Sequence, residues 1–168
     1  MIIQNTGMIS EKFCFEGGQT AEKLWEALTS GEFTKKYFFG QRVESKWKVG
    51  SPITYWENET TVDIQGKILE CDPQRRLSFT FTGVHDTFKR ERSTRVTFEI
   101  KPVGGIVKLT LTHEYLISQD LEADPNTLRG LNNGWPAILS NLKSFLETGK
   151  SFDLLKPDAG EEKERLGC

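Results

Sequence analysis

The sequence predicts an α+β domain in which a curved antiparallel sheet of about seven strands wraps around one long C-terminal helix. Three observations lead to this prediction. Residues 41–116 alternate between apolar and polar side chains with a period of two, as strands do. Residues 131–146 repeat their apolar side chains with a helical period instead. Residues 20–38 carry signals for two short helices, which follow a first strand at residues 9–16.

The first strand and the two helices each have a local signal. Alternation in residues 9–16 directs Phe13 and Phe15 toward the core, and the Gly17-Gly18 pair ends the strand. Thr20 suits the N-cap of a helix, because its hydroxyl can accept a backbone N–H of the first turn. The apolar stripe of that helix consists of Ala21, Leu24, Trp25 and Leu28. A second short helix is expected over residues 31–38.

Six further strands follow as an antiparallel meander. The alternation of Val43, Ser45 and Trp47 predicts a first strand that runs through Trp47, and the last strand continues to Tyr115. Gly104-Gly105 predicts a tight hairpin before that last strand. One face of the predicted sheet is apolar and the other carries Thr, Lys and Glu, as in sheets with one solvated face.

The long helix is the only element left to cover the apolar face. Its stripe consists of Leu131, Trp135, Ile138, Leu139, Leu142, Phe145 and Leu146. Pro136 within this pattern predicts a kink, or a helix start near Trp135, because proline lacks the N–H of the helical ladder. Residues 1–150 are therefore expected to form a single domain. Residues 151–168, with five acidic and three basic side chains, are expected to form a charged, flexible tail.

Composition excludes several classes of protein. The formal net charge of −2 argues against a nucleic-acid partner. No apolar run approaches the ~18 residues of a spanning helix, so no membrane insertion is expected. Cys14, Cys71 and Cys168 are too widely spaced for a disulfide framework or a metal knuckle. We therefore expect reduced thiols at Cys14 and Cys71 and a cytoplasmic setting. No spacing of ligands predicts a metal site, and no glycine-rich loop predicts a nucleotide cofactor.

Several strings resemble a known superfamily. TAEKLWEALTSGEF, YFFG and VESKWKVGSPITYW resemble the entry segment of the SRPBCC (START-like) superfamily. GKILECDPQRRLSFTF, STRVTFEIKPVGGIVKLTLTHEY and GWPAILSNLKSFLETG resemble its branch related to the activator of the heat-shock-protein-90 ATPase. The resemblance covers residues 9–150. It implies the helix-grip fold, with a cavity between sheet and helix that holds an apolar ligand in many relatives.

The residues support such a cavity on physical grounds, because large rings on a concave sheet do not close easily onto one helix. A cavity lined by aromatic rings with a few polar tips is typical of a small-molecule site. The alternative is that the rings simply fill the core. The expected lining consists of Trp47, Tyr55, Phe79, Phe81, Phe98, Leu111, His113, Tyr115, Trp135 and Leu139. His113 is either a hydrogen-bonded core histidine or a polar group of this cavity.

No catalytic constellation is evident. His85 and Asp86 are adjacent in the polar 84–94 connection, where neighbouring side chains need not face each other, and no nucleophile motif accompanies them. The basic run Lys89–Arg92 is expected to be a solvated hairpin end. Its alternative is a rim that receives an acidic head group or a protein partner.

The leading functional hypothesis is a non-enzymatic domain that binds a small apolar or amphipathic molecule. One alternative is a protein-interaction module related to chaperone ATPase activators of the stress response. Another is a cyclase- or hydrolase-like enzyme, for which His113 is the one inward-facing general acid–base. The better-known activator holds its chaperone with a further N-terminal domain that has no counterpart here. We therefore expect this chain alone not to stimulate the chaperone ATPase strongly.

Overall fold

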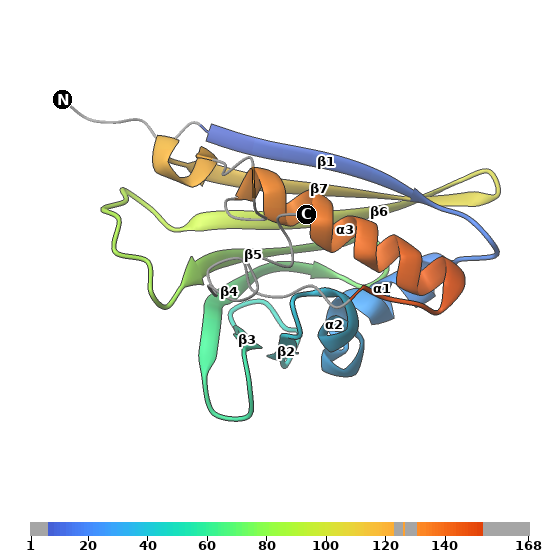
Figure 1. Ribbon diagram of the computed structural model, residues 1–168, viewed down its shortest axis with the longest axis horizontal. Coiled ribbons are helices and arrows are strands. Elements are labelled where there is room, and N and C mark those ends of the chain that lie inside the picture. The colour runs from blue at the N-terminus through green and yellow to red at the C-terminus, as the bar shows by residue number, and fades with distance from the viewer. Residues whose placement is uncertain (1–6, 123–125, 127–130, 153–168) are drawn as a thin grey trace.

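Seven antiparallel strands form one sheet in the computed structural model, which describes residues 7–122, 126 and 131–152 (Figure 1). The strands are β1 (Gly7–Phe15), β2 (Arg42–Ser45), β3 (Pro52–Trp56), β4 (Val62–Asp72), β5 (Arg76–Gly83), β6 (Thr94–Val103) and β7 (Ile106–Leu116). The helices are α1 (Ala21–Thr29), α2 (Gly31–Tyr37), the 3₁₀ turn η1 (Ser118–Leu121) and α3 (Leu131–Thr148). The strand order β1-β7-β6-β5-β4-β3-β2 is that of a meander to which β1 adds beside β7. The predicted α+β helix-grip fold is confirmed.

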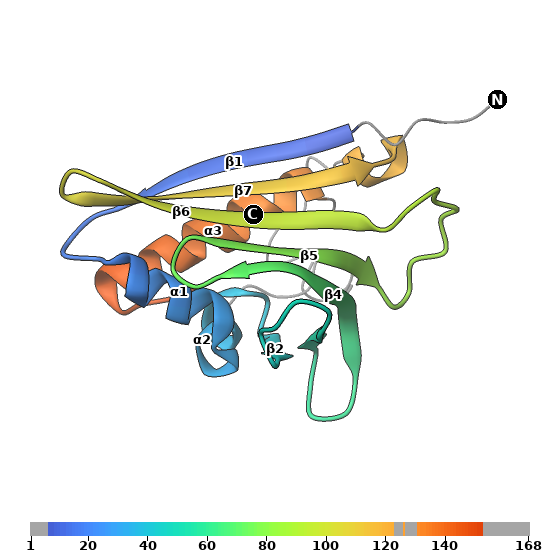
Figure 2. The same ribbon diagram turned by 180° about the vertical axis from the view of Figure 1, so that it is seen from behind.

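Helix α3 crosses one face of the sheet, and the strands lie in front of it when the molecule is seen from behind (Figures 1 and 2). Strand β7 shows how the sequence produces this layering. Val107, Leu109 and Leu111 face α3 and are buried, whereas Lys108 and Thr110 between them are only partly covered. The period of two thus gives the sheet one apolar and one solvated face.

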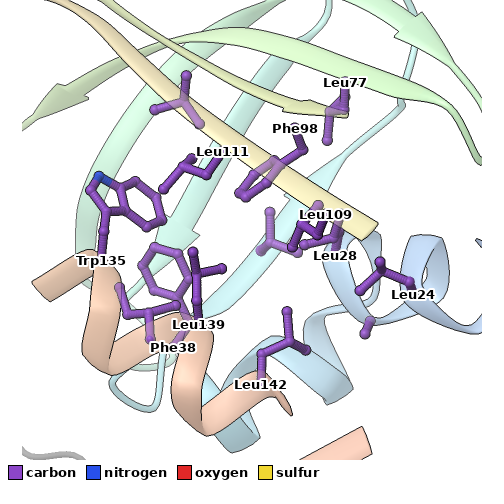
Figure 3. Close-up of a cluster of buried hydrophobic side chains, with 14 of the residues drawn as sticks. Leu24, Leu28, Phe38, Leu77, Phe98, Leu109, Leu111, Trp135, Leu139 and Leu142 are labelled. Atoms are coloured by element: carbon purple, nitrogen blue, oxygen red, sulfur yellow. The ribbon is translucent and has the colours of Figure 1, made fainter. Parts of the chain in front are cut away.

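The core lies where α3 meets the sheet and α1 (Figure 3). Trp135, Leu139 and Leu142 of α3 are each 2% exposed or less. Leu24 and Leu28 of α1 close the same cluster from the side (Figure 3). Burial of each such side chain contributes about 1.5–3 kcal/mol, so this contact anchors α3 to the sheet.

The helix starts follow from local chemistry. The Thr20 hydroxyl accepts the Lys23 N–H at 3.1 Å, which confirms Thr20 as the N-cap of α1. Helix α3 begins at Leu131, four residues before Trp135, and contains Pro136 in its second turn. The alternative of a helix start near Trp135 is therefore wrong. A proline so close to the N-terminus removes only one bond of the helical ladder, so the helix continues through it.

Two aromatic residues leave the expected alternation. Strand β2 ends at Ser45, and Trp47 has a left-handed backbone with φ 56°, although its half-buried ring still packs against the core. Tyr115 has φ 64° and is the extra residue of a β-bulge in β7, so the next buried position falls on Leu116. The guanidinium carbon of Arg92 lies 3.6 Å from the centre of the Tyr115 ring. The prediction that Tyr115 continues the buried face of β7 is wrong, because a bulge shifts the alternation by one residue.

The sheet bends where β4 passes closest to β5. A Cβ atom at Gly66 would lie 1.7 Å from the backbone oxygen of Thr80. The β4–β5 register also shifts between Ile68 and Glu70. Only glycine allows the two backbones to approach this closely, so Gly66 fixes the curvature of the sheet.

The described chain ends beside α3. The buried side chain of Asn141 accepts the Phe152 N–H at 2.6 Å and donates to the Phe152 carbonyl at 2.9 Å. These two bonds hold the segment after α3 against the helix. Residues 153–168, most of the predicted tail, lie outside the described residues. Within the described part of the chain, no helix is both long and apolar enough to cross a membrane.

Candidate functional site

A pocket of about 270 Å³ opens at the end of the sheet where α3 begins. It is lined by residues from the start of β4, the end of β5, the connection between β5 and β6, and the start of β6. The C-terminal half of β7, η1 and the first residue of α3 also contribute. Its apolar wall consists of Phe81, Gly83, Phe88 and Leu131. Its polar lining consists of Asp63, His85, Asp86, Arg90, Thr94, His113 and Asp120.

A chain of hydrogen bonds runs beneath this pocket. The Trp135 indole N–H donates to Nδ1 of His113 at 3.1 Å, which fixes Nδ1 as an acceptor because an indole nitrogen only donates. The ring proton of the neutral imidazole is therefore on Nε2, which donates to the Thr94 hydroxyl at 2.9 Å. Thr94 in turn donates to the Phe81 carbonyl oxygen at 2.5 Å. Every polar atom of this chain has a partner.

The surroundings of His113 keep its imidazole neutral. Burial lowers the pKa of His113 to about 3, with Asp120 opposing the shift and Arg90 adding to it. At neutral pH both ring nitrogens are engaged and the ring carries no positive charge. Such a histidine supports the fold, and it neither donates nor accepts a proton without breaking the chain of hydrogen bonds below the pocket.

An ion-pair cluster centred on Arg90 holds the rim of the pocket. The Arg90 guanidinium binds Asp120 of η1 with two hydrogen bonds of 2.6 Å each, and its Nε binds Asp86 at 2.6 Å. The hydrogen bonds that Arg90 donates to Asp120 and Asp86 raise the pKa of Arg90. Burial would raise the pKa of Asp120, but the bonds from Arg90 and from the Ile117 N–H outweigh it and lower that pKa. The cluster thus joins the β5–β6 connection to η1.

Asp63 reaches the opposite side of the pocket through a second β-bulge. On β4, Val62 pairs with Trp56 and Ile64 pairs with Tyr55, which leaves Asp63 between them as the extra residue. A bulge redirects a side chain, and here the Asp63 carboxylate joins the pocket lining. The buried Gln41 donates its amide N–H to Asp63 at 2.7 Å. Among the described atoms, the amide oxygen of Gln41 has no hydrogen-bond partner.

Residues 19–147 match the protein family described as Activator of Hsp90 ATPase homolog 1-like protein. The match covers most of the chain. The chain belongs to this family. No curated protein matches it significantly in sequence.

Solved structures share the fold of this family member. The solution structure of the Aha1 dimer from Colwellia psychrerythraea superimposes with a TM-score of 0.66 and 21% identity, over 86% of this chain and 99% of that one. PFC0360w, an HSP90 activator from Plasmodium falciparum, gives a TM-score of 0.63 and 22% identity, over 83% and 96% of the two chains. CalU16 from Micromonospora echinospora gives 0.60 and 18%, over 95% and 82%. At identities this low, the superpositions establish a common fold and nothing beyond it.

The ten lining residues predicted from the sequence do not lie together in this Hsp90-activator-like domain. Phe81 and His113 line the described pocket. Six others are at most 3% exposed and belong to the packed core; they are Tyr55, Phe79, Phe98, Leu111, Trp135 and Leu139. Trp47 is half-buried beside the core, and Tyr115 lies at the β7 bulge.

Ring contacts join several of these core residues to one another. Phe38 stacks on Tyr55 with ring centres 4.7 Å apart and meets Trp135 edge to face at 5.8 Å. Phe98 meets the other side of Trp135 edge to face at 6.2 Å. Aromatic rings at these distances and angles are in stabilising contact. These rings therefore pack against one another between the sheet and α3, and the described pocket lies near the start of α3.

Sequence reasoning missed the charged half of the pocket. Asp86 and Arg90 lie in a segment interpreted as a solvated hairpin end, and their spacing of four residues was the available signal for an ion pair. Asp120 lies 30 residues from Arg90, and Asp63 enters the lining only through a bulge. Neither feature leaves a trace in the local pattern of the sequence. Among the described residues, no group of three metal-ligating side chains lies close enough together to hold an ion.

Proposed function

We propose that this domain binds a small amphipathic molecule in the pocket between the sheet and the start of α3, without catalysing its conversion. The pocket itself is the observation that carries the proposal. It combines an apolar wall, which includes Phe81 and Leu131, with a polar rim of charged side chains. Small-molecule sites have this composition, in which apolar surface supplies affinity and a few polar groups orient the ligand.

Two further features support binding over catalysis. His113, the histidine at the base of the pocket, is neutral and has both nitrogens engaged. The Arg90 guanidinium is engaged by two carboxylates and holds the rim of the pocket together.

Cys14 and Cys71 are free thiols, which suits a binding protein of the reducing cytoplasm.

Filling the pocket tests this proposal. Gly83 lines the pocket, and a Cβ atom there meets nothing closer than a backbone oxygen at 4.0 Å. Gly83→Leu is therefore expected to weaken binding of an apolar dye by roughly tenfold or more, since its side chain occupies the ligand space. Fluorescence titration measures the binding, and thermal melting checks that the fold is kept.

A matched control comes from the hairpin between β6 and β7. Gly105 is equally open, with no atom within 4 Å of its would-be Cβ, and it lies away from the pocket. Gly105→Leu is expected to leave dye affinity unchanged. Equal affinity of all three proteins, or the absence of saturable one-to-one binding to the unaltered protein, would contradict the proposed function.

A second candidate function is regulation of a chaperone ATPase, which the family match favours. In this case the domain would act as a protein-interaction module in the stress response. We expect addition of the chain at a one-to-one ratio to leave the steady-state ATPase rate of heat-shock protein 90 within about twofold of its basal value. A stimulation of several-fold would instead favour the second candidate.

A further inference from the structure

Charged residues that face each other directly across the described strands have opposite signs, with one exception. Arg76 of β5 faces Glu99 of β6, and the two groups form an ion pair at 2.9 Å. Asp72 of β4 faces Arg76 as well. Arg95 of β6 faces Glu114 of β7. Such pairs stabilise a sheet, because side chains directly opposite each other are close neighbours on one face.

The exception lies near the hairpin between β6 and β7, on the solvated face of the sheet. Lys101 of β6 directly faces Lys108 of β7. Lys12 of β1 faces Thr110, which makes it a diagonal neighbour of Lys108 on the same face. Strands β1, β7 and β6 lie side by side there (Figure 2). Like charges directly opposite each other are destabilising, so this part of the sheet departs from the pairing found elsewhere in it.

The positive charge of these three lysines is not balanced locally. Within the described part of the chain, none of the three forms an ion pair. Glu99, two residues before Lys101, is already bound by Arg76. Glu11, the neighbour of Lys12, lies on the core-facing side of β1, because successive side chains of a strand alternate. The chain as a whole has a net charge of −2, so a basic composition does not explain this local excess.

The spacing of the lysines suits a row of carboxylates. They come from three neighbouring strands, and adjacent strands lie about 4.8 Å apart, so their backbone positions extend over roughly 10 Å. An extended acidic segment carries side chains on one side at every second residue, about 6.7 Å apart. Two of its carboxylates can therefore meet the lysines at once, whereas a single phosphate group is smaller than the span.

Other anionic partners suit this surface less well. Anionic membranes are recognised by clusters of about four to eight basic residues, and this surface has three. Nucleic-acid sites belong to basic domains, often with aromatic side chains for stacking. Here the residues that face or adjoin the lysines on neighbouring strands are Cys14 and Thr110. An acidic protein segment thus matches both the charge and the composition of the surface.

We propose that Lys12, Lys101 and Lys108 form a docking surface for an acidic segment of a partner protein. Carboxylates placed between the lysines relieve the repulsion that the sheet alone leaves unbalanced. None of the three lysines lines the described pocket. This inference therefore goes beyond the proposed function and does not depend on it.

A peptide of eight glutamates, titrated into ¹⁵N-labelled protein at about 50 mM salt, tests the surface. Changes in the NMR shifts of backbone amides are expected to saturate and to be largest around the three lysines in β1, β6 and β7. Affinity should fall as salt is added, because salt screens exposed charges. A peptide of eight glutamines is the control probe and should cause no such changes.

Two substitutions of Lys108 test its part in docking. Lys108→Glu is expected to weaken binding of the acidic peptide by roughly tenfold. The same substitution should raise the melting temperature, because a carboxylate then faces Lys101. A merely structural role would not predict more stability together with less binding. Lys108→Thr removes the charge without adding one and should weaken binding by several-fold.

Lys67→Glu is the matched control. Lys67 is an exposed lysine of β4 whose partner on β3 is Pro52, and it changes the net charge by the same amount. It is expected to leave affinity for the acidic peptide within about twofold of the unaltered protein.

Several results would overturn the proposal. They are the absence of saturable binding, an equal loss of affinity in Lys67→Glu and Lys108→Glu, and NMR changes that map to another part of the surface. Vesicles of phosphatidylglycerol and a DNA duplex serve as competing anions. If either binds through Lys108 more tightly than the acidic peptide does, the proposed class of partner is wrong.

Discussion

Replacing Gly66 with alanine is expected to lower the free energy of unfolding by more than about 3 kcal/mol, at the upper end of single substitutions. The alanine Cβ would lie 1.7 Å from the Thr80 backbone oxygen, and neither strand can yield without breaking the ladder between β4 and β5. Denaturant unfolding followed by circular dichroism measures the change. We expect a large loss of stability, or a protein that does not fold.

Gly105→Ala is the control for this substitution. The residue lies in the hairpin between β6 and β7, its backbone is not left-handed, and its Cβ would meet nothing within 4 Å. Its stability is expected to stay within about 0.5 kcal/mol of the unaltered protein, as for most surface changes. A Gly66→Ala protein as stable as the Gly105→Ala protein would contradict the role of Gly66 in the bend.

The second large effect is a loss of stability in acid caused by His113. Its pKa is about 3 in the folded protein and about 6.5 in the unfolded chain. Between these values the unfolded chain binds one proton more than the folded protein, so stability rises with pH in this window. As pH falls below about 6.5, the free energy of unfolding is expected to drop by about 1.4 kcal/mol per pH unit, down to about pH 3.

Substitutions isolate this contribution from that of the carboxylates. The lowered pKa of Asp120 also removes stability in acid, but only as the pH falls below the unfolded pKa of an aspartate, near 4. His113→Phe removes the titrating ring and is expected to flatten the profile between pH 6.5 and pH 4. At neutral pH it should cost about 1–3 kcal/mol, because the Trp135 N–H and the Thr94 hydroxyl lose their partner.

His85 supplies the matched control, because it is exposed and belongs to the polar rim. His85→Gln is expected to reproduce the pH profile of the unaltered protein. Denaturant midpoints measured at half-unit steps of pH give all three profiles. An unchanged slope in His113→Phe would show that another group causes the acid sensitivity.

Some elements could be predicted because their signals are local. Thr20 identifies the start of α1 by the chemistry of one hydroxyl, and the stripe that includes Leu139 and Leu142 identifies the buried face of α3. Periods of two and of 3.6 arise from the geometry of a strand and of a helix. They are therefore readable from the sequence without knowledge of what each element contacts.

Other features depend on contacts between distant segments. Trp47 leaves its strand and Tyr115 forms a bulge, although both continue an unbroken alternation in the sequence. A bulge depends on how two strands pair, and left-handed backbone at a non-glycine residue is maintained only by the surrounding structure. The alternation alone therefore predicted the wrong backbone conformation at both residues.

The sequence by itself determined the order of the elements, the apolar face of the sheet and the helix that covers it. How the rings on that face pack against one another was decided only by the tertiary structure. Aromatic side chains predict a lined cavity and a filled core equally well, because the difference lies in how closely rings such as Phe38 and Trp135 pack. In the structure these two rings are in edge-to-face contact. The described pocket is likewise a product of the tertiary structure, because Asp63, Arg90 and Asp120 line it from three distant segments.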